Sequence, residues 1–416
     1  MTRGSISALE KILSRRLGEL ARVTDAPGNL TRTFLSPAMR RANARVGEWM
    51  RAAGLTVRED LVGNLIGRLE SKTPGAKTLL LGSHLDTVRD AGRFDGALGV
   101  LLPIAALEEL KRRDVALPFA VEVVGFSEEE GVRFASAYLG SKGYAGKLRA
   151  ADLNFRDATG VSIGDALRTF GKGKFSIPAA AHRSSDLLGY LEVHIEQGPV
   201  LETKGLAVGV VSAIAGQTRG RLTFRGRAGH AGTTPMNLRR DALTGAAELI
   251  LFAETLARGC EPLVVTVGTV AVAPGAPNVI PGEVTVSLEV RHPRDDSRDA
   301  AVKLLVDVAK KIARQRKLTV AWQPTQDNGA VACSPELTAR LEQSVRAVQR
   351  RSLALVSGAG HDAVVMSSLT PVAMLFVRCR EGLSHHPNEF AAPADLKVAL
   401  RVVVDFLERL ATHTTS

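Results

Sequence analysis

Two different hydrophobic patterns divide the chain. In the first half, short apolar runs alternate with stretches of helical periodicity, one of which covers residues 101–113. The apolar runs are residues 78–82 (TLLLG), 118–126 (PFAVEVVGF) and 190–195 (YLEVHI). Strands that are apolar on both faces are typical of a sheet that helices cover on each side. The first half therefore predicts a mixed α/β structure with buried strands.

The pattern changes near residue 213. Residues 283–292 (EVTVSLEVRH) alternate strictly between polar and apolar, which is typical of an antiparallel strand with one face in solvent. The surrounding segment predicts the order strand, helix, strand, strand, helix, strand, which is typical of a small open-faced sandwich. The expected elements are 219–227, 239–258, 263–273, 283–291, 297–316 and 318–323.

After residue 330 the first pattern returns, with a helix expected over 335–351, a buried strand over 371–379 and a last helix over 393–410. We therefore expect a discontinuous larger domain, formed by residues 1–212 and 329–416, with a smaller domain of residues 213–328 inserted in it. The predicted fold class is α/β: a large domain with a mixed sheet flanked by helices, plus an inserted α+β open-faced sandwich.

The composition excludes several classes of protein. Of the 416 residues, 45% are hydrophobic and 23% charged, which is too apolar for a disordered chain. Lys and Arg number 54 against 43 Asp and Glu, which gives a net charge of +11. The basic residues are scattered in pairs and no nucleic-acid-binding motif is present, so we expect no nucleic-acid partner.

The sequence shows no sign of export or membrane insertion. The longest nearly uninterrupted apolar run, residues 97–107, is about half a membrane span, and the N-terminal region indicates a charged amphipathic helix rather than a secretory signal. The three cysteines, Cys260, Cys333 and Cys379, do not suit a disulfide framework. We therefore expect no membrane partner and a cytoplasmic location.

Histidine and carboxylate side chains gather at the ends of predicted strands of the larger domain. The carboxyl edge of such a sheet brings distant segments together. Imidazole and carboxylate ligands without thiolates suit Zn, Mn or Co rather than a structural cysteine site. Taken singly, a pair such as His84 and Asp86 is more often hydrogen-bonded than metal-ligating, and an acidic run such as 128–130 is usually a solvated helix start. The segments are 82–96 (GSHLDTVRDAGRFDG), 126–134 (FSEEEGVRF), 191–202 (LEVHIEQGPVLE) and 381–389 (EGLSHHPNE).

A family resemblance joins these segments. The motifs HLDTV, FDG, EEEGVRF, HIEQGPVLE, AGHAGTTPM, NVIPG and SGAGHDA occur in this order. The chain thereby resembles the M20 metallopeptidase superfamily, and within it the amidohydrolase branch of allantoate amidohydrolases, N-carbamoyl-L-amino acid hydrolases and β-ureidopropionases. HIEQGP is characteristic of this branch rather than of its peptidase relatives. The resemblance covers nearly the whole chain.

The resemblance implies two divalent metal ions per subunit, Zn or Mn, with Co or Ni as further possibilities. Asp95 would bridge the ions and Glu129 would be the general base. Apart from the resemblance, the spacing of His84 and Asp86 lets the carboxylate orient the imidazole, so Asp86 is a further candidate of the catalytic site. His385, rather than His386, matches the family pattern Ser-His-x-Pro-x-Glu. The implied metal ligands are His84, Asp95, Glu130, His194 and His385.

The resemblance also implies a set of substrate residues. His230 would reach into the neighbouring subunit's site and stabilise the oxyanion, which implies a homodimer formed through the inserted domain. Gln197, Asn278 and Arg291 would hold a substrate carboxylate, to which a guanidinium makes a two-pronged match. His361 would contact the substrate. Without the family match, His230 is equally a loop histidine, and Arg291 is more often a solvated strand residue.

The implied reaction is hydrolysis of a linear amide or ureido C–N bond in a small carboxylate-bearing substrate. Residues 82–96 and 126–134 resemble allantoate amidohydrolases, so we expect allantoate to be cleaved to a ureidoglycine-type product with release of ammonia and CO2. The alternative is an N-carbamoyl-L-amino acid hydrolase or β-ureidopropionase. Two further alternatives, ranked after these, are an N-acyl amino acid amidohydrolase and an M20 dipeptidase.

Overall fold

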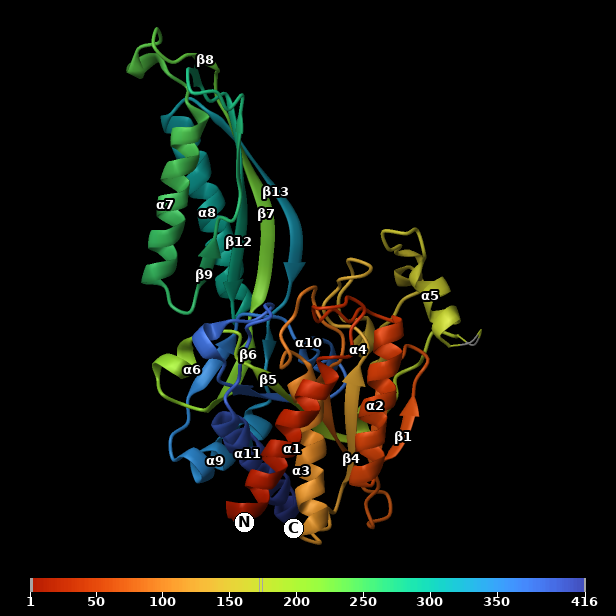
Figure 1. Ribbon diagram of the computed structural model, residues 1–416. Helices are drawn as coiled ribbons and strands as arrows, with labels where there is room; N and C mark the ends of the chain where they lie inside the picture. Colours follow the sequence, from red (N-terminus) through yellow and green to blue (C-terminus); the bar gives the residue numbers. More distant parts are fainter. Residues whose placement is uncertain (1–2, 172, 174, 415–416) are drawn as a thin grey trace. The chain divides into compact units, whose positions relative to one another are not determined.

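The computed structural model of the protein describes residues 3–171, 173 and 175–414. The chain forms two compact units (Figure 1), one made of Met1–Ser212 with Cys333–Ser416 and the other of Ala213–Ala332. The smaller unit thus ends at Ala332, where the sequence pattern placed the end of the inserted domain at residue 328.

The larger unit is built on a mixed sheet, as the sequence predicts. Its strands are β1 (Thr56–Glu59), β2 (Leu65–Leu69), β3 (Thr78–His84), β4 (Ala120–Phe126), β5 (Leu187–Ile195), β6 (Val208–Ile214), β15 (Ala354–Ser357) and β16 (Val372–Val377). They follow the order β1-β2-β4-β3-β5-β16-β6, with β15 beside β6. Strand β14 (Val331–Ala332) of the smaller unit pairs with Ala213 and Ile214, the last residues of β6. Strands β3, β4, β5 and β16 are parallel, whereas β2 and β6 are antiparallel to their neighbours. The carboxyl ends of four strands therefore meet at one edge.

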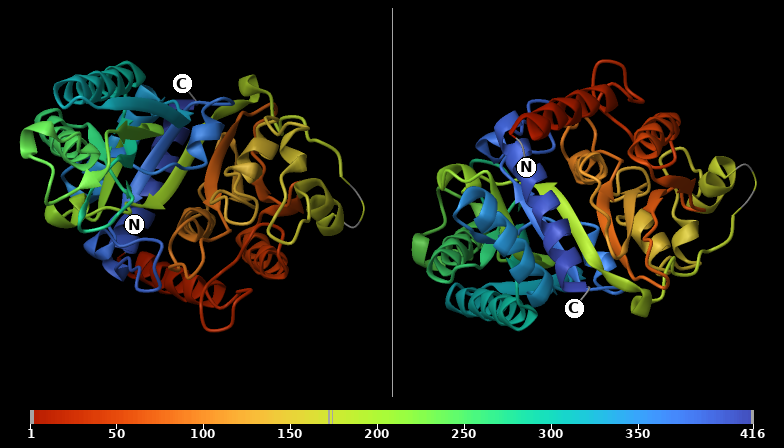
Figure 2. Two further views of the ribbon diagram at one scale, coloured as in Figure 1. Left: turned by 90° about the horizontal axis from the view of Figure 1, so that it is seen from above. Right: turned by 90° about the horizontal axis from the view of Figure 1, so that it is seen from below.

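Helices cover this sheet, and five long ones bury the main apolar core (Figures 1 and 2). They are α1 (Arg3–Leu20), α2 (Pro37–Ala53), α3 (Ala97–Arg112), α9 (Pro335–Gln349) and α11 (Pro393–Thr414). Helix α3 contacts both α1 and α11 as well as β3 and β5. Four shorter helices complete the unit: α4 (Leu139–Tyr144), α5 (Ile163–Phe170), α6 (Val200–Thr203) and α10 (Ala363–Met366).

The alternation of side chains along the central strands separates the apolar core from the polar groups. On β5, Leu191 and Val193 belong to the core with the long helices, while Glu192 and His194 alternate with them and lie on the other face. On that face, the N–H of Ala363 in α10 donates to Glu192 at 2.9 Å. A strand can therefore be wholly buried and still present polar side chains at its end.

The smaller unit is an antiparallel sheet with two helices. Its main strands follow the order β10-β12-β7-β13, with β9 beside β12. Figure 1 shows both helices on the same face of the sheet, where Val284, Val286, Leu288 and Val290 of β12 are buried. The elements are β7 (Gly216–Arg225), β8 (Gly229–His230), α7 (Ala242–Gly259), β9 (Val264–Thr266), β10 (Val270–Ala273), β11 (Val279–Ile280), β12 (Glu283–His292), α8 (Asp295–Gln315) and β13 (Thr319–Asn328).

One strand prediction in this unit is wrong. The segment 263–273 forms two short strands, β9 and β10, instead of one, and both pair with β12. Between them, the hydroxyl of Ser287 accepts the N–H groups of Gly268 and Thr269 at 3.1 and 2.9 Å. The side chain of β12 replaces a backbone carbonyl at this point, which interrupts the ladder.

Within the residues that the structure describes, no helix is long and apolar enough to cross a membrane.

Candidate metal centre

The carboxyl ends of the parallel strands bring the predicted ligands of the larger unit together. His84 is the last residue of β3 and lies opposite Phe126, the last residue of β4. The acidic run 128–130 therefore begins two residues beyond the same edge. His194, near the end of β5, lies opposite Phe376 of β16, after which the chain continues to His385.

Asp95 lies among the histidines, and its two carboxylate oxygens point to different ones. Its Oδ1 is 3.0 Å from Nε2 of His194 and 3.6 Å from Nε2 of His84. Its Oδ2 is 3.3 Å from Nε2 of His385, and that nitrogen lies 3.6 Å from Oε1 of Glu130. One carboxylate thus joins two sets of donors.

Donor atoms of these residues are close enough to share metal ions. In each of three groups, all the donor atoms lie within 4.8 Å of one another. The groups are His84, Asp95 and His194; Asp95, Glu130 and His385; and His84, Glu129 and Glu130.

The backbone fixes which ring nitrogen of two histidines faces Asp95. Nδ1 of His84 is 3.0 Å from the carbonyl oxygen of Asp86, and Nδ1 of His194 is 2.9 Å from that of Ile195. Because a carbonyl only accepts, each Nδ1 carries the hydrogen, and Nε2 of the neutral ring turns a lone pair toward Asp95. A lone pair facing a carboxylate is unfavourable without a cation between them. The donor set therefore fits a metal ion.

The histidines keep Asp95 ionised. Burial opposes its ionisation, but where no cation lies between them, protonated Nε2 atoms of His194, His385 and His84 donate hydrogen bonds to Asp95 and hold its pKa well below its usual range. An ionised carboxylate has lone pairs on both oxygens and can bind a cation on each side.

Asp86 fixes the loop that carries the acidic run. Its Oδ1 accepts the N–H of Glu129 at 3.0 Å, and its Oδ2 accepts the N–H of Glu130 at 3.2 Å. Glu128 stabilises the loop, because its carboxylate accepts the N–H of Leu139 at 3.0 Å. Glu129 and Glu130, but not Glu128, are among the grouped donors.

The position of Glu129 suits a general base. Burial raises the pKa of Glu129 well above its usual value; His84 opposes this shift and Glu130 adds to it. A carboxyl group with a raised pKa takes up and releases a proton nearer to neutral pH. A carboxylate oxygen of Glu129 also lies within 4.8 Å of a ring nitrogen of His84 and of a carboxylate oxygen of Glu130. Glu129 could therefore also be a metal ligand.

Two residues without a predicted role, Glu389 and Ser384, hold Asp95 in place through hydrogen bonds. Oε1 of Glu389 accepts the N–H groups of Phe94 and Asp95 at 2.8 and 3.1 Å. Oγ of Ser384 lies 2.9 Å from Oδ2 of Asp95 and 3.1 Å from Oε2 of Glu389. Both residues belong to the Ser-His-x-Pro-x-Glu pattern, which served only to place His385.

Two glycines make room for this packing. Gly96 has a φ of +63°, and a Cβ at this position would lie 2.4 Å from the ring of His84. A Cβ on Gly92 would lie 2.3 Å from the side chain of Glu389. Close approach therefore requires both glycines of the turn before α3, and Gly96 is also required by its backbone conformation.

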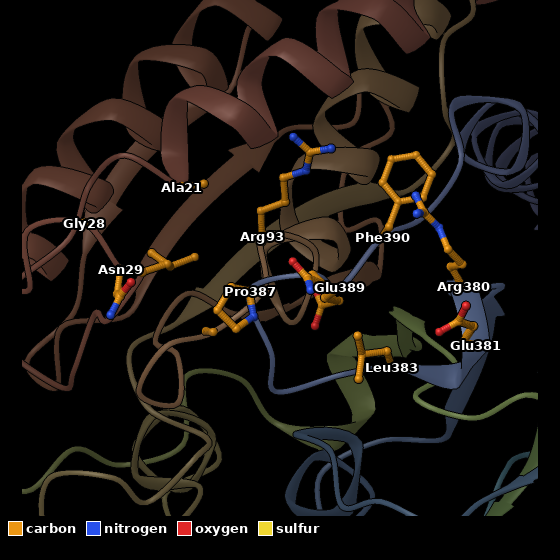
Figure 3. Close-up of a pocket in the computed structure, with 13 residues that line it drawn as sticks. Ala21, Gly28, Asn29, Arg93, Arg380, Glu381, Leu383, Pro387, Glu389 and Phe390 are labelled. Atoms are coloured by element: carbon orange, nitrogen blue, oxygen red, sulfur yellow. The ribbon is translucent and has the colours of Figure 1, made fainter.

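A cavity of about 610 Å³ lies beside Glu389. Figure 3 shows Glu389 between Arg93 and Leu383 at its wall, next to Pro387. Among the described residues that line it, none is a predicted site residue. The cavity thus adjoins the support of Asp95 rather than the donor cluster itself.

The structure places two predicted substrate residues of the larger unit beside the donors. Nε2 of Gln197 is 3.0 Å from Oδ2 of Asp95. His361 is 1% exposed, its ring centroid is 4.5 Å from that of His194, and its Nε2 is 2.8 Å from Oγ of Ser357. His361 thus supports a candidate ligand, and its direct contact with a substrate stays a prediction.

The remaining predicted residues lie in the smaller unit. Strands β8 and β11 pair, and the N–H of Ala231 donates to the carbonyl of Asn278 at 2.9 Å, so His230 and Asn278 are neighbours. Both are exposed. Arg291 lies near the end of β12, and its Nε is 2.5 Å from Oε1 of Glu289.

Comparisons with known proteins agree with this site. Residues 80–409 match the model of Peptidase family M20/M25/M40. The chain is 41% identical to an allantoate deiminase of Arabidopsis thaliana, over 94% of this chain and 81% of that protein. It is 40% identical to an N-carbamoyl-L-amino-acid amidohydrolase of a Pseudomonas species, over 95% and 96%. The crystal structure of a hydantoinase/carbamoylase family amidase from Burkholderia multivorans superposes with a TM-score of 0.91 at 32% identity, covering 97% of this chain and 98% of that one.

A mixed α/β unit with a histidine and carboxylate cluster at the carboxyl edge of its sheet, together with these relatives, defines a metal-dependent hydrolase. The chain belongs to Peptidase family M20/M25/M40. The fold class and the family resemblance predicted from the sequence are thereby confirmed.

The support of Asp95 by Glu389 predicts a loss of metal affinity on substitution. Glu389→Ala should weaken metal binding by about 10–100-fold, because Asp95 loses the acceptor that holds its backbone. Glu389→Gln keeps an acceptor oxygen and should lose less. Competition with a chelating dye would measure the affinities, with the exposed Glu381 changed to Ala as the control. Equal affinities for Glu389→Ala and the wild type would show that the support does not matter.

Proposed function

We propose that the protein hydrolyses the C–N bond of a carbamoyl or ureido group in a small carboxylate-bearing molecule, with allantoate as the favoured substrate. The observation that carries the proposal is Asp95, which joins two donor sets next to Glu129. The names of the relatives, allantoate deiminase and N-carbamoyl-L-amino-acid amidohydrolase, support the substrate class. N-carbamoyl-L-amino acids are the alternative substrates.

Two divalent ions, Zn or Mn with Co or Ni as further possibilities, would be held by the two donor sets. His84, His194 and Asp95 would hold one, and Asp95, Glu130 and His385 the other. When bound, such a pair polarises a carbonyl group and lowers the pKa of water toward neutrality.

The residues of the chain then have separate tasks. Glu129 takes a proton from the attacking water on its carboxylate and delivers it to the leaving nitrogen. Asp86 keeps Glu129 in place through the backbone N–H, so that its side chain remains free to move the proton. Gln197, whose Nε2 is 3.0 Å from Oδ2 of Asp95, would hold the substrate carboxylate beside this centre.

Substitution of Glu129 distinguishes a general base from a metal ligand. Glu129→Gln should keep the metal content of the wild type and lose about 10²–10⁴-fold in kcat, because the amide cannot accept the proton. Metal analysis and steady-state kinetics would measure both, with Glu381→Gln as the surface control. Loss of metal would make Glu129 a ligand, and a near-normal kcat would remove it from catalysis.

The substrate is tested by ammonia release. Protein treated with chelator and then supplied with Mn or Zn should release ammonia from allantoate, with N-carbamoyl-L-amino acids cleaved more slowly and a dipeptide not at all. The chelated protein should be inactive. Faster cleavage of an N-carbamoyl-L-amino acid would favour an N-carbamoyl-L-amino acid hydrolase. Absence of metal-dependent hydrolysis of all these compounds would contradict the proposal.

The smaller unit supports a homodimer. Arg225 on β7 pairs with Glu283, and His230 follows beyond this end of the sheet. Arg291 is eight residues further along β12 from Glu283, which is about 27 Å at the usual rise of a strand. His230 and Arg291 of one chain therefore cannot both hold one small substrate. Two copies could each contribute one end of the unit to a site.

Exposed apolar side chains mark a surface on which a second copy could pack. Leu251 of α7 is 66% exposed, Val264 of β9 54% and Val270 of β10 47%. Strand β10 stands at the edge of its sheet within the described residues, and α7 contacts β9. An unpaired strand edge beside exposed apolar residues is a typical association surface.

The dimer predicts an effect of charge at this surface. Leu251→Glu should convert a particle of twice 44.2 kDa into a monomer, because the carboxylate would be buried without a partner. Leu304→Glu, on the neighbouring helix α8 and 42% exposed, is the control. Light scattering after gel filtration gives the masses. A wild-type monomer, or a dimer that survives Leu251→Glu, would contradict this interface.

A further inference from the structure

One phenol beside the donor cluster has no role in the proposed reaction. Tyr138 immediately precedes α4, and its backbone N–H donates to the carbonyl of Glu129 at 3.2 Å. Its φ is +66°, a conformation that a bulky side chain adopts only when its surroundings impose it. The loop thus holds the phenol in a fixed relation to the proposed base.

The hydroxyl end of Tyr138 reaches a second loop of the site. A Cβ on Gly360 would lie 1.9 Å from the phenol oxygen, so that oxygen packs directly against the backbone of Gly360. The next residue, His361, packs against His194. The side chain of Tyr138 therefore spans from the loop of Glu129 to the loop that supports a candidate metal ligand.

The hydroxyl group lacks a hydrogen-bond partner among the described side chains and backbone groups, although the residue is only partly exposed. Lys142 does not supply one, because its Nζ donates to the carbonyl of Ala137 and lies 6.0 Å from the centroid of the ring. The hydroxyl oxygen is not among the fully buried polar atoms that lack a partner, so water or a ligand can reach it.

The surroundings of the phenol are acidic. Burial raises the pKa of Tyr138 far above its usual value, and the carboxyl groups of Glu129, Asp362, Glu192 and Glu130 add to the shift. The phenol therefore stays neutral.

We propose that the hydroxyl of Tyr138 binds the terminal NH2 of the carbamoyl or ureido group and thereby distinguishes such substrates from N-acyl compounds. The assignment rests on the proposed function. The phenol oxygen accepts an N–H that a carbamoyl group has and an acetyl group lacks. A site built to pair with such a group discriminates against the analogue without it, because a polar group is then left unpaired.

The test compares one pair of substrates in wild type and Tyr138→Phe. For an N-carbamoyl-L-amino acid, kcat/KM should fall about tenfold, the loss of roughly one hydrogen bond. For the N-acetyl derivative of the same amino acid, kcat/KM should change less than about twofold, since no hydrogen bond is lost. Where that compound is not turned over, its inhibition constant takes the place of kcat/KM. Metal content should be unchanged.

Two outcomes would overturn the assignment while leaving the proposed function intact: an equal loss for both compounds, or no loss for either. A wild-type protein that hydrolyses no carbamoyl or ureido compound would overturn both.

A pair of glycine variants provides a second test. Gly360→Ala should displace the phenol oxygen and reproduce the selective loss seen in Tyr138→Phe. Gly358→Ala, in the same loop, adds a Cβ that meets nothing within 4 Å and should leave both substrates unaffected. Retained selectivity in a folded Gly360→Ala protein would contradict the assignment, as would a loss in Gly358→Ala as large as that in Gly360→Ala.

Discussion

The carboxylate of Asp95 is the group on which the rest of the site depends. It is 4% exposed, and three imidazoles lie within 3.6 Å of its oxygens. A buried carboxylate among histidine lone pairs is costly without positive charge. The surrounding fold is arranged to keep Asp95 in this position, through Glu389 behind its backbone and the glycine turn that brings it up to His84.

The donors reach Asp95 from two kinds of support. His84 and His194 stand on central strands whose alternate residues are anchored in the apolar core. Glu130 and His385 stand on loops. Asp86 accepts the N–H of Glu130, and the hydroxyl of Ser384, next to His385, donates to Glu389, so that side-chain carboxylates hold these loops in place of a sheet. Catalytic groups on loops held by a rigid scaffold are a common arrangement, because the scaffold provides precision and the loops provide variety.

The sequence predicted most of this arrangement and missed what depends on long-range contact. Continuous apolar runs revealed the buried strands, and motifs at their ends revealed the residues that the structure gathers around Asp95. The role of Glu389 could not be predicted, because its bond to Asp95 joins residues 294 positions apart. The interruption of segment 263–273 depends on a side chain of another strand. The burial of His361 against His194 is likewise a matter of packing that no local pattern contains.

The two donor sets also differ in their access to solvent. The side chains of His84 and His194 are 3% and 2% exposed, whereas that of His385 is 49% exposed. An ion held as proposed by the second set would exchange with the medium by displacement of a loop histidine, without disturbance of the sheet. The proposed centre would then lose the ion on its loop side before the ion on its strand side.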